Sequence, residues 1–270
     1  HRDLHSFPTR RSSDLSGYTS GVIVSGNYAY ISESMDSGTM YGYLNIIDVS
    51  DPSSPKFIGS YEGIESVIAV EGNYAYVHDL SLERGGLGIV DISIPSSPKL
   101  VGSYNGSIVS VSGNYAYATS IVYLDGAYQT YLEIVDISNP SSPILAGTYG
   151  PVDSTIETAN VAVSGNYVYL ANGIYGLEIV DVSNPSSPTY VGSFTGPHVG
   201  GVTVFGNYAY INDFNNLKIV DISNPSSPIL AGTYDTNGRV SDMSGNYVYL
   251  LDDYGDRKST RLNSSHRIRS

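Results

Sequence analysis

Short apolar and aromatic runs alternate with turn-forming residues through most of this chain. Within residues 161–194 the runs cover 161–163, 167–170, 177–182 and 189–194. Between them lie a Ser-Gly-Asn turn, a short loop and a Pro-Ser-Ser-Pro turn. Aromatic and β-branched residues favour strands, and Gly and Asn tolerate the positive φ angles of tight hairpin turns. The pattern therefore predicts four short antiparallel strands, and residues 16–255 carry no helical period.

The third of these strands is apolar on both faces. Leu177 and Ile179 point to one side of the strand, whereas Val180 and Val182 point to the other. A sheet with one solvated face would alternate polar and apolar residues, so this strand is expected to be covered on both sides. Sheets that are stacked on one another meet this requirement.

The four-strand unit is repeated along the sequence. Six near-copies of Gly-Asn-Tyr-(Ala/Val)-Tyr occur, and they begin at Gly26, Gly72, Gly113, Gly165, Gly206 and Gly245. A period of about 40–50 residues with short strands indicates a propeller or a solenoid, and four antiparallel strands per repeat form one propeller blade. We expect an all-β protein, a β-propeller of four-stranded antiparallel blades. Residues 16–255 would hold five full repeats and parts of others, as a truncated piece of a propeller with six or more blades.

The two ends differ from the rest of the chain. Residues 1–15 and 256–270 hold eight of the 13 Lys and Arg and three of the five His. Both segments resemble translated short-read sequencing adapters, and we interpret them as disordered artefacts outside the fold. Residues 16–255 then carry five Lys or Arg against 23 Asp or Glu, a net charge of −18.

This acidity and the absence of cysteine exclude several classes of function. Nucleic acids and anionic membrane surfaces are bound mainly through Lys and Arg, which are scarce here. Without cysteine the chain has no disulfide framework and no zinc–thiolate site. No run approaches 18 consecutive apolar residues, so we expect no membrane insertion of this segment.

Several repeated residues have a structural interpretation. An aspartate ends each third strand before Ser-x-Pro, where its carboxylate can accept backbone hydrogen bonds of the turn. These turn aspartates are Asp48, Asp91, Asp136, Asp181 and Asp221. A glycine in each fourth strand suggests a bulge or a close backbone approach. These glycines are Gly59, Gly102, Gly147, Gly192 and Gly232.

The third-strand motif resembles a known family. Leu-x-Ile-Val-Asp stands at 87–91, 132–136, 177–181 and 217–221, and Leu-Asn-Ile-Ile-Asp at 44–48 is a variant. It is similar to the LVIVD repeat of bacterial and archaeal proteins that form β-propellers and are often surface-associated. The resemblance implies an extracellular or cell-surface location and brings no established catalytic residues.

Candidate ligand-binding residues lie in the segments that join strands 2–3 and 4–1, which fall on one face of a propeller. These segments vary between repeats, whereas the opposite face has uniform turns, and binding residues concentrate on variable loops of rigid scaffolds. The candidates are acidic or aromatic, with one histidine: Asp36, Tyr41, Glu62, Glu65, Asp79, Tyr123, Asp125, Asp153, Glu157, Tyr175, His198, Asp213, Phe214 and Asp235.

Three interpretations of these residues remain open. They form a solvated acidic rim, or they bind Ca²⁺ through carboxylates, or two of them act as a catalytic pair as in glycoside hydrolysis. We expect no resident cofactor, and Ca²⁺ is the one metal that the residue types suit. The sequence favours a non-catalytic surface or secreted protein that binds a protein or a glycan through this variable-loop face, with room for neighbouring domains in the full-length protein. The alternative is a carbohydrate-active enzyme, a hydrolase or lyase with paired carboxylates.

Overall fold

The computed structural model describes strands and turns over most of the chain. The described residues are 18–34, 42–82, 85–124, 127–152, 160–196, 199–213, 216–236, 238–244, 247–252 and 266–267. The chain divides into two compact units, which are considered separately. Unit 1 comprises His1–Tyr115 with Asp136–Ile144, and unit 2 comprises Ala116–Val135 with Leu145–Ser270. The described part of the chain contains no helix long and apolar enough to cross a membrane.

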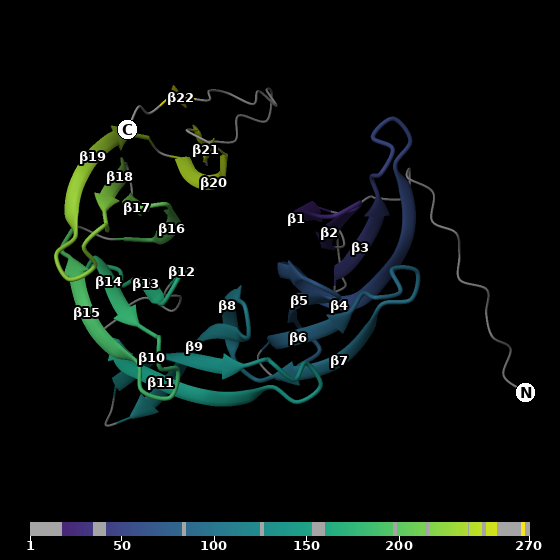
Figure 1. The fold of residues 1–270 in the computed structure, drawn as a ribbon, viewed down its shortest axis with the longest axis horizontal. Coiled ribbons are helices and arrows are strands. Elements are labelled where there is room, and N and C mark those ends of the chain that lie inside the picture. Colours follow the sequence, from purple (N-terminus) through teal and green to yellow (C-terminus); the bar gives the residue numbers. More distant parts are fainter. Residues whose placement is uncertain are drawn as a thin grey trace, which may run out of the picture. The chain divides into compact units, whose positions relative to one another are not determined.

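Unit 1 is built on one antiparallel sheet of seven strands in chain order (Figure 1). Its strands are β1 (Tyr18–Ser25), β2 (Tyr28–Ser34), β3 (Gly42–Asp48), β4 (Lys56–Glu71), β5 (Tyr74–Asp79), β6 (Gly86–Asp91) and β7 (Lys99–Tyr104), and β8 (Ser107–Ser112) follows.

Strand β4 is both the fourth strand of one repeat and the first strand of the next, which the sequence pattern predicts as two strands. We expected the candidates Glu62 and Glu65 in a loop that joins two strands, but one strand of 16 residues runs through both positions. Gly63 has φ of +104°, a conformation that glycine adopts easily. The pairing register also shifts between Ile64 and Ser66. The chain therefore passes from one blade to the next without leaving the sheet.

Unit 2 contains two complete four-stranded sheets. One has the order β12 (Asn160–Ser164), β13 (Tyr167–Ala171), β14 (Leu177–Asp181) and β15 (Thr189–Phe194). The other has the order β16 (Gly201–Phe205), β17 (Tyr208–Asp213), β18 (Asn216–Asp221) and β19 (Ile229–Asp235). The remaining strands are β9 (Tyr115–Leu124), β10 (Ala127–Asp136), β11 (Ile144–Val152), β20 (Gly238–Ser244), β21 (Tyr247–Asp252) and β22 (His266–Arg267). The last of these lies in the C-terminal segment that we interpreted as an artefact.

The predicted blade matches the observed one closely. The four strands of the 160–194 repeat begin and end within one residue of the predicted runs. Gly165 has φ of +58° in the first hairpin turn, as the Gly-Asn pair predicts. The pattern arises because each run is bounded by a residue that favours a turn.

Apolar residues of neighbouring sheets within a unit form the core. In unit 2, Leu177 and Ile179 of β14 are fully buried and share a cluster with Val202, Ala209 and Ile211 of the next sheet. In unit 1, a matching cluster joins Leu44 and Ile46 to β4 and β5. The two-sided apolar pattern of the third strand thus reflects stacking of one blade on the next.

All five turn aspartates make the expected hydrogen bond. In each repeat, a carboxylate oxygen accepts from the backbone N–H two residues later, at 2.7–2.9 Å. Hydrogen bonds from the serine side chain, and then from its backbone N–H, hold the pKa of each carboxyl below its ordinary value. These aspartates therefore fix the turn that leads into Pro-Ser-Ser-Pro.

Candidate functional site

Half of the candidate ligand-binding residues lie in the described structure. Asp36, Tyr41, Asp125, Asp153, Glu157, His198 and Phe214 fall outside the described residues. The other seven are Glu62, Glu65, Asp79, Tyr123, Tyr175, Asp213 and Asp235. Only Tyr175 of these lies in a turn, because the strands run further than the sequence predicts. The assignment of the remaining six to loops was wrong.

Asp79 is buried rather than presented to a ligand. It lies at the end of β5 with no exposed surface. One carboxylate oxygen accepts hydrogen bonds from the Ser81 backbone N–H at 2.8 Å and its hydroxyl at 2.5 Å. The other accepts from the Tyr61 hydroxyl of β4 at 3.3 Å. Burial, and then the negative charge of Asp79, raises the pKa of Tyr61 to about 12, so this hydroxyl stays protonated at neutral pH.

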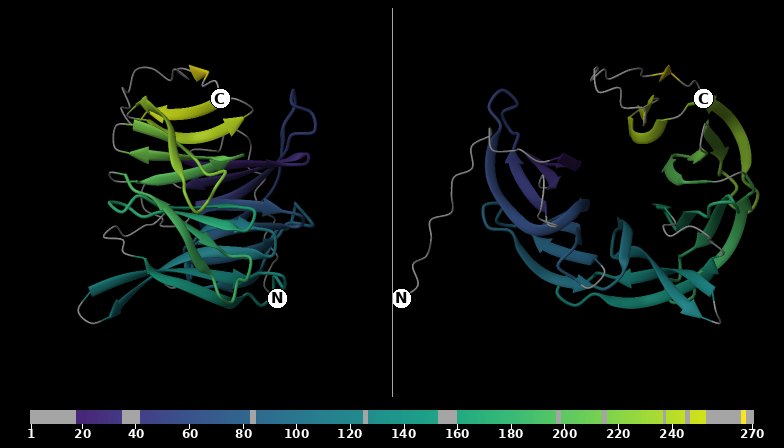
Figure 2. Two further views of the ribbon diagram at one scale, coloured as in Figure 1. Left: turned by 60° about the vertical axis from the view of Figure 1, so that its left-hand side comes forward. Right: turned by 180° about the vertical axis from the view of Figure 1, so that it is seen from behind.

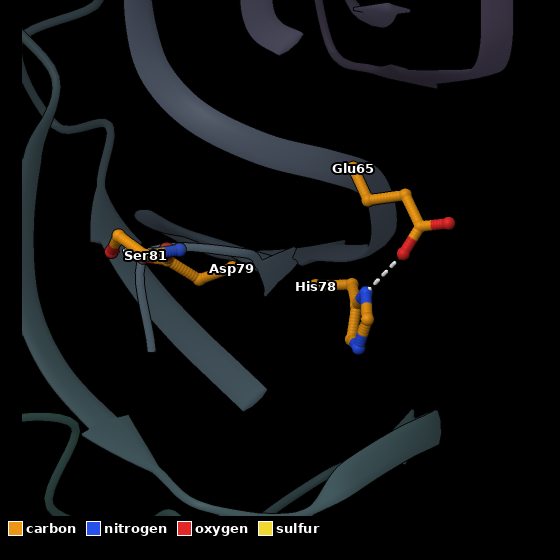
Figure 3. Close-up of polar contacts among 4 residues, drawn as sticks. All are labelled: Glu65, His78, Asp79 and Ser81. Carbon is orange, nitrogen blue, oxygen red and sulfur yellow. Dashed lines mark hydrogen bonds and ion pairs between the residues drawn. The ribbon is translucent and has the colours of Figure 1, made fainter. Parts of the chain in front are cut away.

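Glu65 and His78 form a separate pair on the adjoining strands. His78 Nδ1 lies 2.5 Å from Glu65 Oε2, and the two side chains are 19% and 58% exposed. Figure 3 shows His78 directed at Glu65, away from Ser81 and Asp79. Successive residues of a strand point to opposite faces, so His78 and Asp79 do not act together. The arrangement offers no Ser–His–Asp relay, although all three residue types are close in sequence.

A row of polar pairs recurs where the second and third strands of a blade meet, and the sequence analysis missed it. One member stands five residues after the first Tyr of Gly-Asn-Tyr, and the other is the variable residue of Leu-x-Ile. In β2 and β3, Asn45 Nδ2 donates to Glu33 Oε2 at 2.8 Å. In unit 2, Asn172 Nδ2 donates to Glu178 Oε2 at 3.1 Å.

The same two positions form an ion pair in the following blade. Lys218 Nζ lies 3.0 Å from Asp213 Oδ2, and both side chains are largely buried at 14% and 12% exposure. Asp213 is therefore engaged with a partner of its own sheet. A charge of this burial is strongly destabilising without its partner, which argues for a structural role.

A tyrosine of the preceding blade reaches the polar pair at Glu178. The Tyr149 hydroxyl of β11 donates to Glu178 Oε1. Burial, and then Glu178, raises the pKa of Tyr149 above its ordinary value. Tyr61 contacts Asp79 from the corresponding place in unit 1. We call these contacts the polar seam: a hydroxyl from one blade meets an acid of the next. Repetition of Tyr two residues after the strand-4 glycine was the signal that could have revealed it.

A run of exposed apolar side chains that includes the candidate Tyr123 lies on a long hairpin. Strands β9 and β10 each have ten residues, compared with five in β13 and β14. Four consecutive residues at the end of β9 are exposed: Ile121 (41%), Val122 (40%), Tyr123 (61%) and Leu124 (44%). Since neighbours in a strand face opposite sides, both faces are apolar and open to solvent. The hairpin extends beyond the other strands of its unit, and is seen in teal at the lower left of the left view in Figure 2.

Within the described ranges, no three His, Cys, Asp or Glu side chains gather to hold a metal ion. Glu65, Asp79 and Asp213 accept contacts from His78, Ser81 and Lys218 respectively. Three of the described carboxylates that the sequence offered for Ca²⁺ or for paired catalysis are thus each engaged in a separate contact within the protein.

The blades and their stacking define an all-β protein of the β-propeller class. The chain belongs to the LVIVD repeat family, whose model matches residues 16–63, 62–106, 107–150, 157–196 and 196–236. These five matches follow the five Leu-x-Ile-(Ile/Val)-Asp strands, and they confirm the resemblance seen in the sequence. No curated protein matches the chain.

Several solved structures are similar to it at low sequence identity. A periplasmic gluconolactonase of Pseudomonas aeruginosa has a TM-score of 0.63 at 13% identity, with 85% of this chain and 76% of that chain covered. A protein from Lactobacillus plantarum has a TM-score of 0.63 at 12% identity, with coverages of 87% and 77%. A functionally unknown protein of Desulfotomaculum acetoxidans has a TM-score of 0.59 at 13% identity, with coverages of 84% and 73%. Identities this low support the fold alone.

Proposed function

We propose that this protein is a non-enzymatic, surface or secreted β-propeller that binds another protein. The observation that carries the proposal is the β9–β10 hairpin, whose residues Ile121, Val122, Tyr123 and Leu124 are all exposed. Exposed apolar residues that are contiguous mark interaction sites more often than scattered ones do. An extended hairpin can also pair its edge with a strand of a partner.

The composition of the hairpin favours a protein over a glycan. Glycans stack on flat aromatic rings and use many polar contacts, whereas three of the four exposed residues here are aliphatic. Tyr175, at 43% exposure in the turn before β14, is the aromatic residue that a glycan platform would use. Unit 2 therefore carries an exposed apolar hairpin that suits a protein ligand and one exposed tyrosine that would suit a glycan.

The enzyme alternative has less support from the described residues. One structural neighbour is named a gluconolactonase, but the likeness extends to the fold and not to residues. Asp79 and Asp213, two of the acids considered for a catalytic pair, are held by Tyr61, Ser81 and Lys218. Asp79 has no exposed surface and the Asp213 side chain is largely buried against Lys218, so neither carboxylate is presented to a substrate.

The test compares the wild-type protein with the double variant Ile121→Ser, Leu124→Ser. Each biotinylated protein is crosslinked to a surface-protein extract of the source organism, and crosslinked partners are identified and quantified. We expect a specific partner crosslinked near the hairpin in the wild type and at least a tenfold loss with the variant. Equal yields for both proteins would contradict the proposal.

A glycan array and an activity screen distinguish the alternatives. The matched control is Tyr175→Ala, which removes an exposed side chain of the same unit and leaves the hairpin intact. Glycan binding that Tyr175→Ala abolishes and the hairpin variant retains would favour a lectin. Turnover of sugar lactones or polysaccharides by the wild type would favour the enzyme.

A further inference from the structure

Three asparagines in the sequence are followed directly by glycine: Asn105, Asn172 and Asn237. Asparagine is one of the chemically labile residues of proteins. It is most labile before glycine, because glycine has no Cβ atom to shield its backbone nitrogen or to restrict its backbone. Asn237 lies outside the described residues. The structure places the other two in opposite environments.

Asn105 is exposed in the connection between two strands. With Gly106 it forms the two-residue link from β7 to β8, all within unit 1. The chain bends at both residues, and neither belongs to a strand. Exposed links between strands reach more backbone conformations than residues that are paired in a sheet. The Asn105 side chain can therefore approach the Gly106 backbone nitrogen.

Asn172 is buried and held in place by its neighbours. It is 4% exposed, and its Nδ2 donates to Glu178 Oε2 at 3.1 Å. Its backbone N–H donates to the Gly176 carbonyl oxygen at 2.8 Å. The following residue, Gly173, forms a bridge with Val199. A reaction between the Asn172 side chain and the next backbone nitrogen therefore requires this turn to open first.

We propose that Asn105 is a site of spontaneous covalent modification, at which its amide is converted to aspartate and isoaspartate. The Gly106 backbone nitrogen loses its proton and attacks Asn105 Cγ, and the bond from Cγ to Nδ2 breaks as Nδ2 leaves as ammonia. Water then opens the cyclic imide at either of its two carbonyl carbons. The reaction consumes one water and releases one ammonia, without an oxidant or a reductant. This inference is independent of the proposed function.

Both products change the link between β7 and β8. Each carries a carboxylate in place of a neutral amide, which adds negative charge to a chain that is already acidic. In isoaspartate the main chain also runs through the side-chain Cβ and Cγ atoms, so the link becomes one backbone atom longer. The connection between these two repeats thus differs between newly made and aged protein.

Peptide mapping by mass spectrometry tests the proposal after incubation of the full chain in heavy-oxygen water. We expect heavy oxygen in the peptide that contains residue 105, as aspartate and isoaspartate together. The conversion should be faster at mildly alkaline pH than at neutral pH, because the attacking nitrogen must lose its proton. An unmodified Asn105, or conversion to aspartate without isoaspartate, would overturn the proposal.

Asn172 is the comparison within the same chain. In the folded protein it should react at least about tenfold more slowly than Asn105, because its turn must first open. In concentrated urea the two sites should react at similar rates, since both asparagines precede glycine. Equal rates in the folded protein would overturn the assignment of the exposed link as the preferred site.

Gly106→Ala tests the attacking nitrogen. The added methyl group hinders the approach of this nitrogen to Asn105 Cγ, so conversion at Asn105 should slow severalfold while Asn172 is unaffected. Ser103→Ala, at an exposed residue of β7, is the matched control and should react like the wild type. Repeating the comparison in urea makes it independent of how the variant folds. Undiminished conversion in Gly106→Ala would overturn the proposed route.

Discussion

At the residue scale, a few small side chains determine how each blade turns and stacks. The turn aspartates are identified from sequence because the atoms they bind lie only two residues away. Each accepts the N–H of the serine at that position, for example Ser183 for Asp181 at 2.7 Å. The strand-4 glycines were also identified, but their partner became clear only when the Pro-Ser-Ser-Pro turn of the next repeat was placed against them.

The turn aspartates should make stability depend on pH in acid. The pKa of Asp181 and of Asp221 is lower in the folded chain than in the unfolded one, where it is about 3.9. The stability from these carboxylates is therefore complete above about pH 4 and is lost as the pH falls through the folded pKa. In Asp181→Asn, Asp221→Asn, which keeps an acceptor oxygen without a titration, the decrease in unfolding free energy from pH 6 to pH 3 should be smaller.

Urea denaturation at a series of pH values measures this difference. The control is Glu62→Gln, which removes an exposed carboxyl outside these turns. An unchanged decrease in the double asparagine variant would show that the lowered pKa values contribute nothing to acid stability.

Gly147, which lies against a Pro-Ser-Ser-Pro turn, and Gly232 should respond differently to substitution by alanine. In Gly147→Ala the new methyl group would lie 2.2 Å from the Pro185 carbonyl oxygen, so the blades must separate. We expect a loss of about 1–3 kcal/mol in unfolding free energy, as for other overpacked sites. Gly232→Ala, which meets no such oxygen, should change stability by no more than about 1 kcal/mol. Thermal and chemical denaturation measure both variants. Equal losses of stability in Gly147→Ala and Gly232→Ala would refute the idea that close packing of the turn requires glycine at position 147.

At the element scale, blades are joined by polar contacts as well as by apolar packing. The polar seam places a tyrosine of one blade on an acid of the next, as Tyr149 and Glu178 show in unit 2. The periodic pattern predicted the strands, because it depends on neighbours in the chain. It did not predict that strands would run into the expected loops at Glu62, Tyr123 and Asp235, since strand length depends on pairing with another segment.

Removing one hydroxyl from the seam should weaken blade stacking. Tyr149→Phe takes away a donor to the Glu178 carboxylate and leaves the ring in place. Hydrogen bonds to charged groups contribute about 1.5–3 kcal/mol, so a loss of that order in unfolding free energy is expected. Tyr190→Phe is the matched control, because its hydroxyl contacts Ser193 at an exposed position. The role of the seam would be disproved if both variants melted at the wild-type temperature.

At the scale of the whole molecule, net charge and strand edges influence how the chain interacts with other molecules. The sequence has 26 acidic residues against 13 Lys and Arg, and this net charge of −13 disfavours nucleic acids and anionic surfaces. The second feature is strand edges that have no pairing partner among the described residues. Strand β1 forms an end of the seven-stranded sheet, and its Val22 and Val24 are 60% and 65% exposed. Edges with these properties are templates for pairing with another chain.

The edge at β1 should drive association in solution. We expect the molar mass from light scattering to increase with protein concentration. Val22→Lys, Val24→Lys places charges on the edge and should reduce this association, because lysine on an edge strand opposes strand pairing. The control Ile144→Lys, Leu145→Lys adds the same charges at exposed positions of β11. Similar effects of both double variants would indicate a general effect of charge and not of the β1 edge.

The repeat, the order and class of the strands, the family and the role of the turn aspartates all follow from the amino-acid sequence alone. Each of these depends on residues that are close in the chain or that recur at a fixed period. Only packing in three dimensions shows that Asp79 and Asp213 are engaged by Tyr61 and Lys218, that the β9–β10 hairpin is exposed, and that Pro-Ser-Ser-Pro turns lie against the strand-4 glycines of four repeats. The physical reason is common to all three: they depend on which side chains from different strands or repeats lie against one another, and no local pattern encodes that proximity.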